Sequence, residues 1–285
     1  AKLLRPRLLL ATASAYAKGN RGAPREALYR LATATELLHV FALMHDDRMD
    51  LSGRAGVELP STPEGGASTL LGGDLLHALA VEMIQESVAA FSLSRAIPRR
   101  VHSVSVRTIA GQALEVSRFN DEGKIPGLDA LFELYDLKTG YYSFVAPLLV
   151  GALATAEELA EKDAVTLEEG GLLLGRAFQL RDDTEDIHRL MADPPEGALP
   201  PWELGLLITY LKEEGRLEEA SRLLEPQEHP GVLLKALGDE PLSAWSTAKI
   251  RSLLASGRDC FERLSLKEKE RGLLFTRALD IAELG

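Results

Sequence analysis

Cysteine is nearly absent from this sequence: among its 285 residues only Cys260 is present. A single thiol cannot form a disulfide within the chain, which excludes a disulfide-stapled scaffold and fits a reducing compartment. No apolar run looks long enough to span a bilayer, and no signal peptide is visible. We therefore expect a cytoplasmic location and no transmembrane segment.

Positive charge is also scarce, because 32 Lys and Arg residues face 43 Asp and Glu residues, for a net charge of -11. This balance excludes a general nucleic-acid binder, whose surface would be basic. It does not exclude a small phosphorylated ligand, since local cations and a bound metal can reverse the field inside a cleft.

Strand signals are nearly absent, whereas helical periodicity runs through most of the chain. The fold class that we predict is all-α, and hydrophobic residues at 46% suffice for a sizeable core. Length alone allows one large domain or two modest ones. We expect a single domain over 1–285, with core motifs within 2–190 and a divergent tail over 202–285. Predicted helices cover 3–18, 25–49, 67–91, 99–118, 130–153 and 168–190; loops cover 51–66, 120–127 and 191–201; breaks in the tail fall at Gly215, Pro226, Pro230 and Pro241.

Two acidic clusters share one pattern, Asp-Asp-x-x-Asp, and each ends an apolar helix-like run. Residues three or four apart share a helix face, so each cluster would present its carboxylates on one side. Either cluster alone is better explained as a solvated helix end. Two clusters facing each other would form an oxygen-rich site for Mg²⁺. Their members are Asp46, Asp47 and Asp50, and Asp182, Asp183 and Asp186.

Further motifs accompany the clusters in a fixed order along the chain. They are Lys2 with Arg5-Pro6, His45-Asp46-Asp47, Gly73-Asp74, Gly111-Gln112, Lys138-Thr139-Gly140 and Phe178-Gln179 before Asp182. This ordered set resembles the trans-isoprenyl diphosphate synthases, or polyprenyl synthetases, in particular those that make geranylgeranyl and farnesyl diphosphate.

The resemblance implies an isoprenoid-synthase-type helical bundle around a deep central cavity, assembled as a homodimer. It implies a prenyltransferase that ionises an allylic diphosphate with the help of Mg²⁺, three ions per active site. Isopentenyl diphosphate then attacks the cation, and the chain grows by one isoprene unit.

The resemblance also assigns roles to individual residues. All six aspartates of the clusters would hold metal, and Lys138 would join them in catalysis. Arg54 and Lys138 would contact the allylic diphosphate, and Lys2 and Arg5 the isopentenyl diphosphate. Thr139 and Gln179 would lie near the reacting carbons. Gln112 is equally well read as a substrate contact or as a buried amide. Asp74 is read as the cap of a helix start or as a ligand contact, and the cap is at least as well supported.

Product length is predicted from the residues just before the first cluster. Phe41 and Ala42 lie five and four residues before Asp46, roughly one helical turn below the metals. In the family such a position forms the floor of the cavity, so a bulky Phe41 implies a short product, C20 or C15. The alternative is that Phe41 faces a neighbouring helix.

The sequence departs from the family pattern at several cations. Leu3 stands where an arginine is usual, and Arg54-Ala55-Gly56 where two arginines precede the glycine. A histidine expected between Pro60 and Gly73 is missing, as are lysines after the second cluster. These losses leave three hypotheses open: an elongating prenyltransferase, a terpene cyclase-like enzyme acting on one allylic diphosphate, and a non-catalytic partner subunit. Loops missing from the chain would be a simpler explanation.

Overall fold

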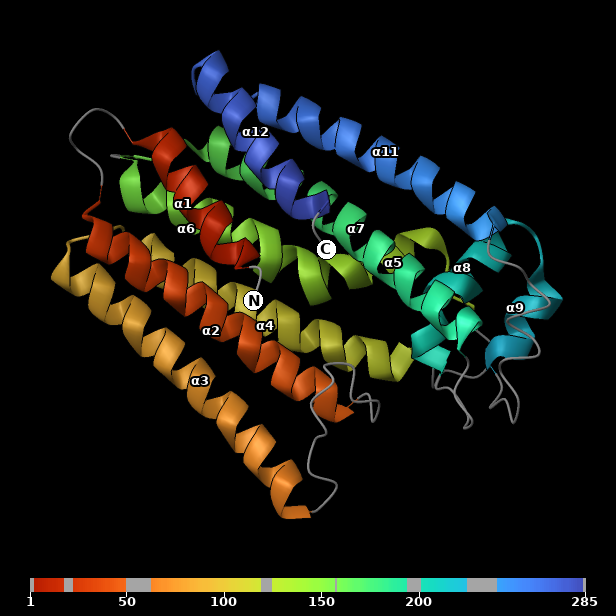
Figure 1. Ribbon diagram of the computed structural model, residues 1–285. Coiled ribbons are helices and arrows are strands. Elements are labelled where there is room, and N and C mark those ends of the chain that lie inside the picture. The colour runs from red at the N-terminus through yellow and green to blue at the C-terminus, as the bar shows by residue number, and fades with distance from the viewer. Residues whose placement is uncertain are drawn as a thin grey trace.

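A computed structural model describes residues 3–17, 23–49, 63–118, 125–156, 158–193, 201–224 and 240–283. These residues form helices and short connections and contain no strand, which confirms the all-α fold class (Figure 1). The helices are α1 (Leu4–Tyr16), α2 (Arg25–Met49), α3 (Pro63–Ala90), α4 (Ala96–Arg118), α5 (Leu128–Tyr135), η1 (Asp136–Val145), α6 (Ala146–Thr155), α7 (Glu161–Ala192), η2 (Pro201–Leu204), α8 (Gly205–Glu213), α9 (Leu217–Leu224), α11 (Glu240–Glu262) and α12 (Glu268–Glu283).

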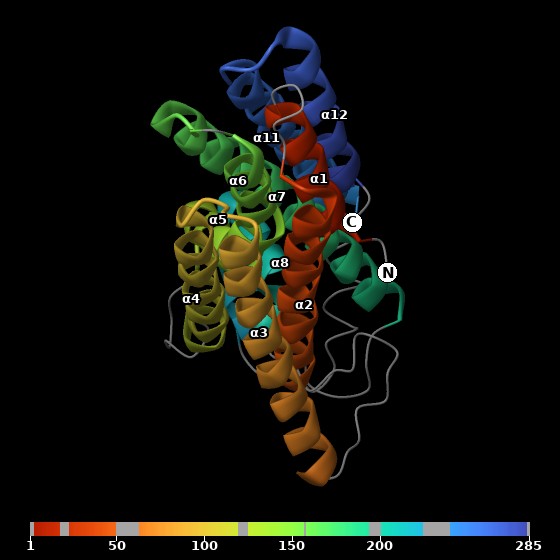
Figure 2. The same cartoon turned by 90° about the vertical axis from the view of Figure 1, so that its left-hand side faces the viewer.

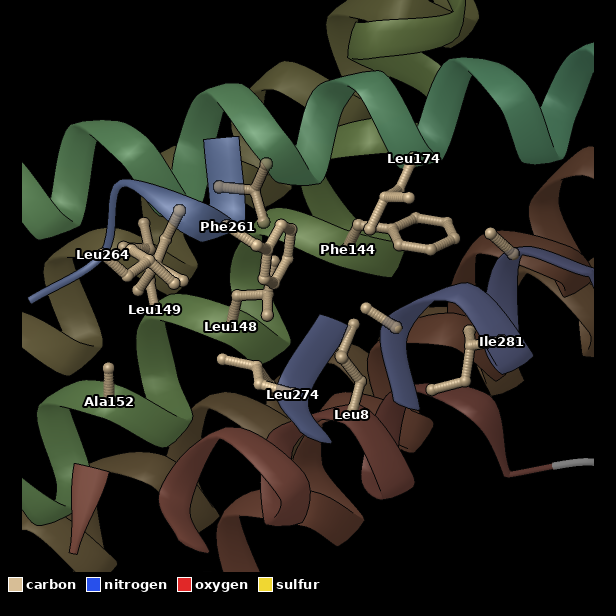
Figure 3. Packing of buried hydrophobic residues seen from close by; sticks show 14 of the residues in the cluster. Leu8, Phe144, Leu148, Leu149, Ala152, Leu174, Phe261, Leu264, Leu274 and Ile281 are labelled. Atoms are coloured by element: carbon tan, nitrogen blue, oxygen red, sulfur yellow. The ribbon is translucent and has the colours of Figure 1, made fainter. Parts of the chain in front are cut away.

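The long helix α7 contacts helices that precede it in the chain and helices of the tail. It packs against η1 on one side and against α11 on the other, and η1 in turn packs against α4 (Figure 1). Figure 3 shows the apolar cluster where these layers meet, with Phe144 and Leu174 beside Phe261, and with Leu8 and Leu274 below them. The two sides of α7 are therefore covered by different neighbours.

The C-terminal half of α7 is buried against the tail. Leu180 and Ile187 of α7 belong to one apolar cluster with Leu207, Leu211 and Leu242. Each of these side chains is almost completely removed from water. The division into domains stays a prediction, but the tail packs on the helix that carries the second acidic cluster.

Two prolines begin helices instead of ending them. Helix α3 begins at Pro63, four residues earlier than the sequence predicted, so the last part of the expected loop is helical. Helix α11 begins at Glu240 with Pro241 in its first turn, so the break predicted at Pro241 coincides with a helix start, while Pro226 and Pro230 lie outside the described residues. Proline is tolerated in the first turn because the N–H that it lacks has no intrahelical partner at that position.

The single helix predicted over 130–153 consists of three segments. Between α5 and α6, the ten residues of η1 form a π-helix. Two glycines of neighbouring helices allow η1 to approach them closely. A Cβ on Gly111 of α4 would lie 2.8 Å from the backbone nitrogen of Lys138. A Cβ on Gly175 of α7 would lie 2.6 Å from the Cα of Gly140.

Helix α3 lies on the outside of the bundle, and its first turns project beyond the other helices (Figure 2). Leucines 70, 71, 75 and 79 on it are between 41% and 67% exposed. Among the described residues, Gly65–Ala90 is long and apolar enough to cross a membrane, judged by length and composition only, with 17% of its apolar window buried. The expectation from run length thus does not hold for this helix, and the absence of a transmembrane segment stays a prediction.

Candidate active site

Lys138 joins the first acidic cluster to the centre of the bundle. Its Nζ lies 3.2 Å from Oδ1 of Asp46 on α2 and 2.6 Å from Oε2 of Glu115 on α4. The three side chains are largely buried, which strengthens such ion pairs relative to exposed ones. The π-helical turn of η1 thus places one cation between carboxylates of two other helices.

The second cluster is tied to the same region through Asp183. Tyr135 Oη donates a hydrogen bond to Asp183 Oδ2 at 2.5 Å, and Gln179 Nε2 donates to Oδ1 at 2.7 Å. Thr139 Oγ1 donates to Gln179 Oε1 at 2.6 Å. Thr139 of η1 is therefore linked to Asp183 of α7 by hydrogen bonds through Gln179.

Burial has the largest influence on the pKa values of Asp183 and Tyr135. It raises the pKa of Asp183 to about 6, although the hydrogen bonds from Tyr135 and Gln179 and the charge of Lys138 act in the opposite direction. Burial, followed by the charge of Asp183, raises the pKa of Tyr135 well above its usual range. The phenol consequently stays protonated and remains a donor.

A pocket of about 30 Å³ lies where these side chains meet. Asp183 and Asp186 of α7 share its wall with Lys138. Asp186 also forms an ion pair with Arg189, at 2.6 Å. The other lining residues are Glu115, Leu134, Tyr135 and Gln179, with Trp202 and Glu203 from the tail. The sequence did not single out Glu115, Tyr135 or Trp202, since none stands in a charged cluster.

The donor atoms suit a hard divalent cation. Around Lys138 they include the carboxylates of Asp46, Glu115, Asp183 and Asp186, whose oxygens are the ligands that Mg²⁺ prefers. Within the described part of the chain, no three His, Cys, Asp or Glu side chains are grouped closely enough to hold a metal. Asp50 and the side chain of Asp47 lie outside that part. Asp46, Asp182, Asp183 and Asp186 are the described residues that would contribute ligands, and this role stays a prediction.

Arg5 lies in a second polar cluster, deeper in the bundle. Its Nη2 donates to Ser143 Oγ at 2.7 Å and to Tyr142 Oη at 3.2 Å, and the guanidinium carbon lies 4.8 Å from the Tyr142 ring centroid. The His39 ring stacks against Tyr142 at 5.9 Å between centroids. Burial, and then the charge of Arg5, lowers the pKa of His39 to about 3, so this histidine is neutral.

His39 was missed in the sequence, although its position carries a signal. It lies seven residues before Asp46, two helical turns away on the same face. His39 Nδ1 and Arg5 Nε are both buried without a hydrogen-bond partner among the described residues. Each buried polar atom of this kind needs an explanation, and a polar ligand that reaches both would provide one.

Phe41 faces a neighbouring helix. Its ring lies 4.8 Å from the ring of His45 and 4.9 Å from that of His77 on α3, measured between centroids. His45 also lies against α3, 3.4 Å from Asp74 Oδ1. The geometry favours the alternative reading of Phe41, whereas Ala42 shares the face of His39 and Asp46 by helical spacing. The floor assignment stays a prediction.

Three further residues, Gln112, Lys2 and Arg54, were predicted to bind substrate. Gln112 lies on α4, one turn before Glu115, and its Nε2 is buried without a partner among the described residues, so neither reading of it is excluded. Lys2 and Arg54 lie outside the described residues.

Comparisons with known proteins point to one family. The family model described as polyprenyl synthetase matches residues 1–193. The chain is 28% identical to the geranylgeranyl diphosphate synthase of Sulfolobus acidocaldarius, over 93% of this chain and 74% of that protein. It is also 28% identical to the geranylfarnesyl diphosphate synthase of Aeropyrum pernix, over 98% of this chain and 88% of that protein.

Solved structures share the fold. A geranylgeranyl pyrophosphate synthetase from the archaeon Geoglobus acetivorans superposes with a TM-score of 0.75 at 23% identity, covering 99% of this chain and 88% of that one. A further geranylgeranyl pyrophosphate synthase gives 0.76 at 20% identity, with the same coverage. The family match extends over both acidic clusters and Lys138, and the chain belongs to the polyprenyl synthetase family of trans-prenyltransferases.

Proposed function

We propose that this prenyltransferase condenses an allylic diphosphate with isopentenyl diphosphate and releases a short product, C20 in length. The observation that carries the proposal is the position of Lys138, 3.2 Å from Asp46 of the first cluster and in one pocket with Asp183 and Asp186 of the second. Relatives over most of the chain are named geranylgeranyl and geranylfarnesyl diphosphate synthases. Nothing in the comparisons favours a cyclase or a silent partner subunit.

The reaction begins when the bond between the allylic carbon and the diphosphate oxygen breaks, with the electron pair leaving on oxygen. Lys138 stabilises the developing negative charge, because a fixed buried cation needs little reorganisation. Mg²⁺ held by Asp46, Asp182, Asp183 and Asp186 would neutralise the same charge. Thr139 and Gln179 are held by their mutual hydrogen bond and border the site of ionisation.

The second substrate would bind deeper, at Arg5. Arg5 and the neutral His39 offer nitrogen atoms without partners among the described residues, and the Arg5 guanidinium is positively charged. A diphosphate is the partner that this pair lacks. The double bond of isopentenyl diphosphate then attacks the allylic cation, a carbon–carbon bond forms, and loss of a proton completes the reaction.

The exposed apolar face of α3 supports a homodimer. Leu71 and Leu75 are 67% and 59% exposed in the single chain, on a helix with little burial of its own. Large exposed apolar patches usually mark a contact surface. A second copy of the chain would cover this face. We also propose that the protein is located in the cytoplasm.

The test is a pair of incubations of purified protein with Mg²⁺, one with farnesyl and isopentenyl diphosphate and one with farnesyl diphosphate alone, followed by mass analysis. A C20 diphosphate that forms only with both substrates is expected. A hydrocarbon or alcohol from the single substrate would replace elongation by a cyclase-like reaction. Turnover that appears only after a second synthase chain is added would indicate a partner subunit.

A further inference from the structure

Both carboxylate oxygens of Asp183 accept hydrogen bonds from neighbouring side chains. Tyr135 Oη is 2.5 Å from Oδ2, and Gln179 Nε2 is 2.7 Å from Oδ1. Hydrogen bonds to a charged carboxylate are short and strong, so they fix the plane of the group. An ionised carboxylate keeps further lone pairs beside these two bonds, so they set the orientation of Asp183 without excluding it from metal binding.

The donor in this arrangement is itself rigid. Tyr135 is only 3% exposed and belongs to the apolar cluster that includes Ala177 and Leu180 of α7. It is the last residue of α5, directly before η1, and Lys138 follows three residues later. A hydrogen bond from Tyr135 therefore fixes the position of η1, with its lysine, relative to the acidic face of α7.

From this geometry we infer that Tyr135 is a positioning residue for the second acidic cluster, and that it acts through its hydrogen bond to Asp183. The inference rests on the proposed function, since it assigns the work within the same site. Asp182, Asp183 and Asp186 lie on one helix and would supply the metal-binding oxygens of α7. Tyr135 keeps these oxygens and Lys138 at a fixed separation, so that both meet one diphosphate.

The same helix provides a matched control. Tyr16 Oη donates to Asp163 Oδ2 at 3.1 Å, and this pair is also buried. Asp163 lies 20 residues before Asp183 on α7, about 30 Å away along the helix axis. Tyr16→Phe removes a comparable bond far from the acidic cluster, so its effect measures the structural contribution of such a pair.

The experiment measures Mn²⁺ binding, as a probe for the Mg²⁺ site, by electron paramagnetic resonance of the full chain with inorganic diphosphate present. Tyr135→Phe should weaken Mn²⁺ affinity about tenfold, the loss typical of one hydrogen bond to a charged group, without changing the number of ions bound. Tyr16→Phe should leave affinity within about twofold of the parent. Raising Mg²⁺ should restore kcat of Tyr135→Phe, which a general packing defect would not allow.

Two further variants test this hydrogen bond directly. Asp183→Asn should weaken Mn²⁺ affinity at least as much as Tyr135→Phe does, and adding Tyr135→Phe to Asp183→Asn should weaken it little further, because the shared hydrogen bond is already lost. Unchanged affinity in Tyr135→Phe, or a full additional loss in the double variant, would overturn the inference, and circular dichroism establishes that each variant is folded. Failure of the parent protein to elongate would instead contradict the proposed function, so the two failures are distinguishable.

Discussion

At the scale of single residues, Lys138 is the group on which the site depends most. It balances Asp46 and Glu115 when no diphosphate is present. Lys138→Gln should lower kcat about 10²- to 10³-fold, the usual effect of removing one group that stabilises developing negative charge. Steady-state kinetics with both substrates measures this loss.

The control for Lys138 is Arg258→Gln, which removes an exposed pair with Glu262 far along α11. An exposed ion pair contributes little, so rate and stability should stay near the parent values. A rate of Lys138→Gln within threefold of the parent would contradict the role of Lys138 at the allylic diphosphate.

His39 makes stability depend on pH. Its pKa is about 3 in the folded chain and 6.5 in the unfolded chain, so below pH 6.5 only the unfolded state binds the proton. Its contribution is present above pH 6.5 and is lost as the pH falls toward 3, by about 1.4 kcal/mol per unit. His39→Gln should remove this dependence.

Denaturant unfolding at pH 7.5 and 5.5 checks the prediction for His39. The parent should lose about 1.4 kcal/mol more than His39→Gln between these pH values. Equal losses in both proteins would show that His39 titrates normally, in which case it is not buried beside Arg5.

At the scale of secondary-structure elements, the close approach of η1 and α4 depends on Gly111. A Cβ at this position would lie 2.8 Å from the backbone nitrogen of Lys138 and 2.8 Å from the Cβ of Leu137. Gly111→Ala should therefore displace η1, at a cost of about 1–3 kcal/mol in unfolding free energy. Activity should fall more than stability alone explains, because Lys138 moves with η1.

Gly272→Ala provides the comparison, since nothing lies within 4 Å of a Cβ on this helical glycine of α12. It should raise stability by about 1 kcal/mol with no change in rate. Thermal melts and kcat are measured for both variants. A Gly111→Ala protein with parental activity would show that η1 tolerates the shift.

The sequence predicted the helices well because burial on one face leaves a period near 3.6. It could not predict η1. A π-helical segment changes the spacing of apolar residues over only a few positions, so the sequence there still fits an α-helix. It could not place Arg5 beside His39 either, because that pairing depends on the packing of α1, α2 and η1 in three dimensions. The contact of Phe41 with His77 of α3 could not be predicted for the same reason: the distance of Phe41 from Asp46 was readable, but the direction of its side chain was not.

At the scale of the whole molecule, the tail completes the site although it looks divergent. Thr184 Oγ1 donates to Ser246 Oγ at 3.0 Å, and Trp202 and Glu203 close one side of the acidic pocket. The second cluster therefore depends on residues far beyond the family match, which ends at residue 193. Sequence motifs alone would have assigned the whole site to the first two thirds of the chain.

The exposed face of α3 leads to the last prediction, which concerns assembly. Leu71→Glu with Leu75→Glu places two charges on the face that a second copy would cover, and burying unpaired charges is costly. Sedimentation should show a dimer for the parent and a monomer for the double variant. Leu273→Glu on α12, where Leu273 is 55% exposed, is the control and should remain dimeric.

A membrane is the competing partner for the same helix, since α3 is long and apolar enough to enter one. Parent protein that is monomeric in sedimentation but binds phospholipid vesicles, with binding lost in the double variant, would contradict the dimer. A dimer that stays in solution when vesicles are added would assign the face to a second copy, because a covered apolar surface gains nothing from lipid.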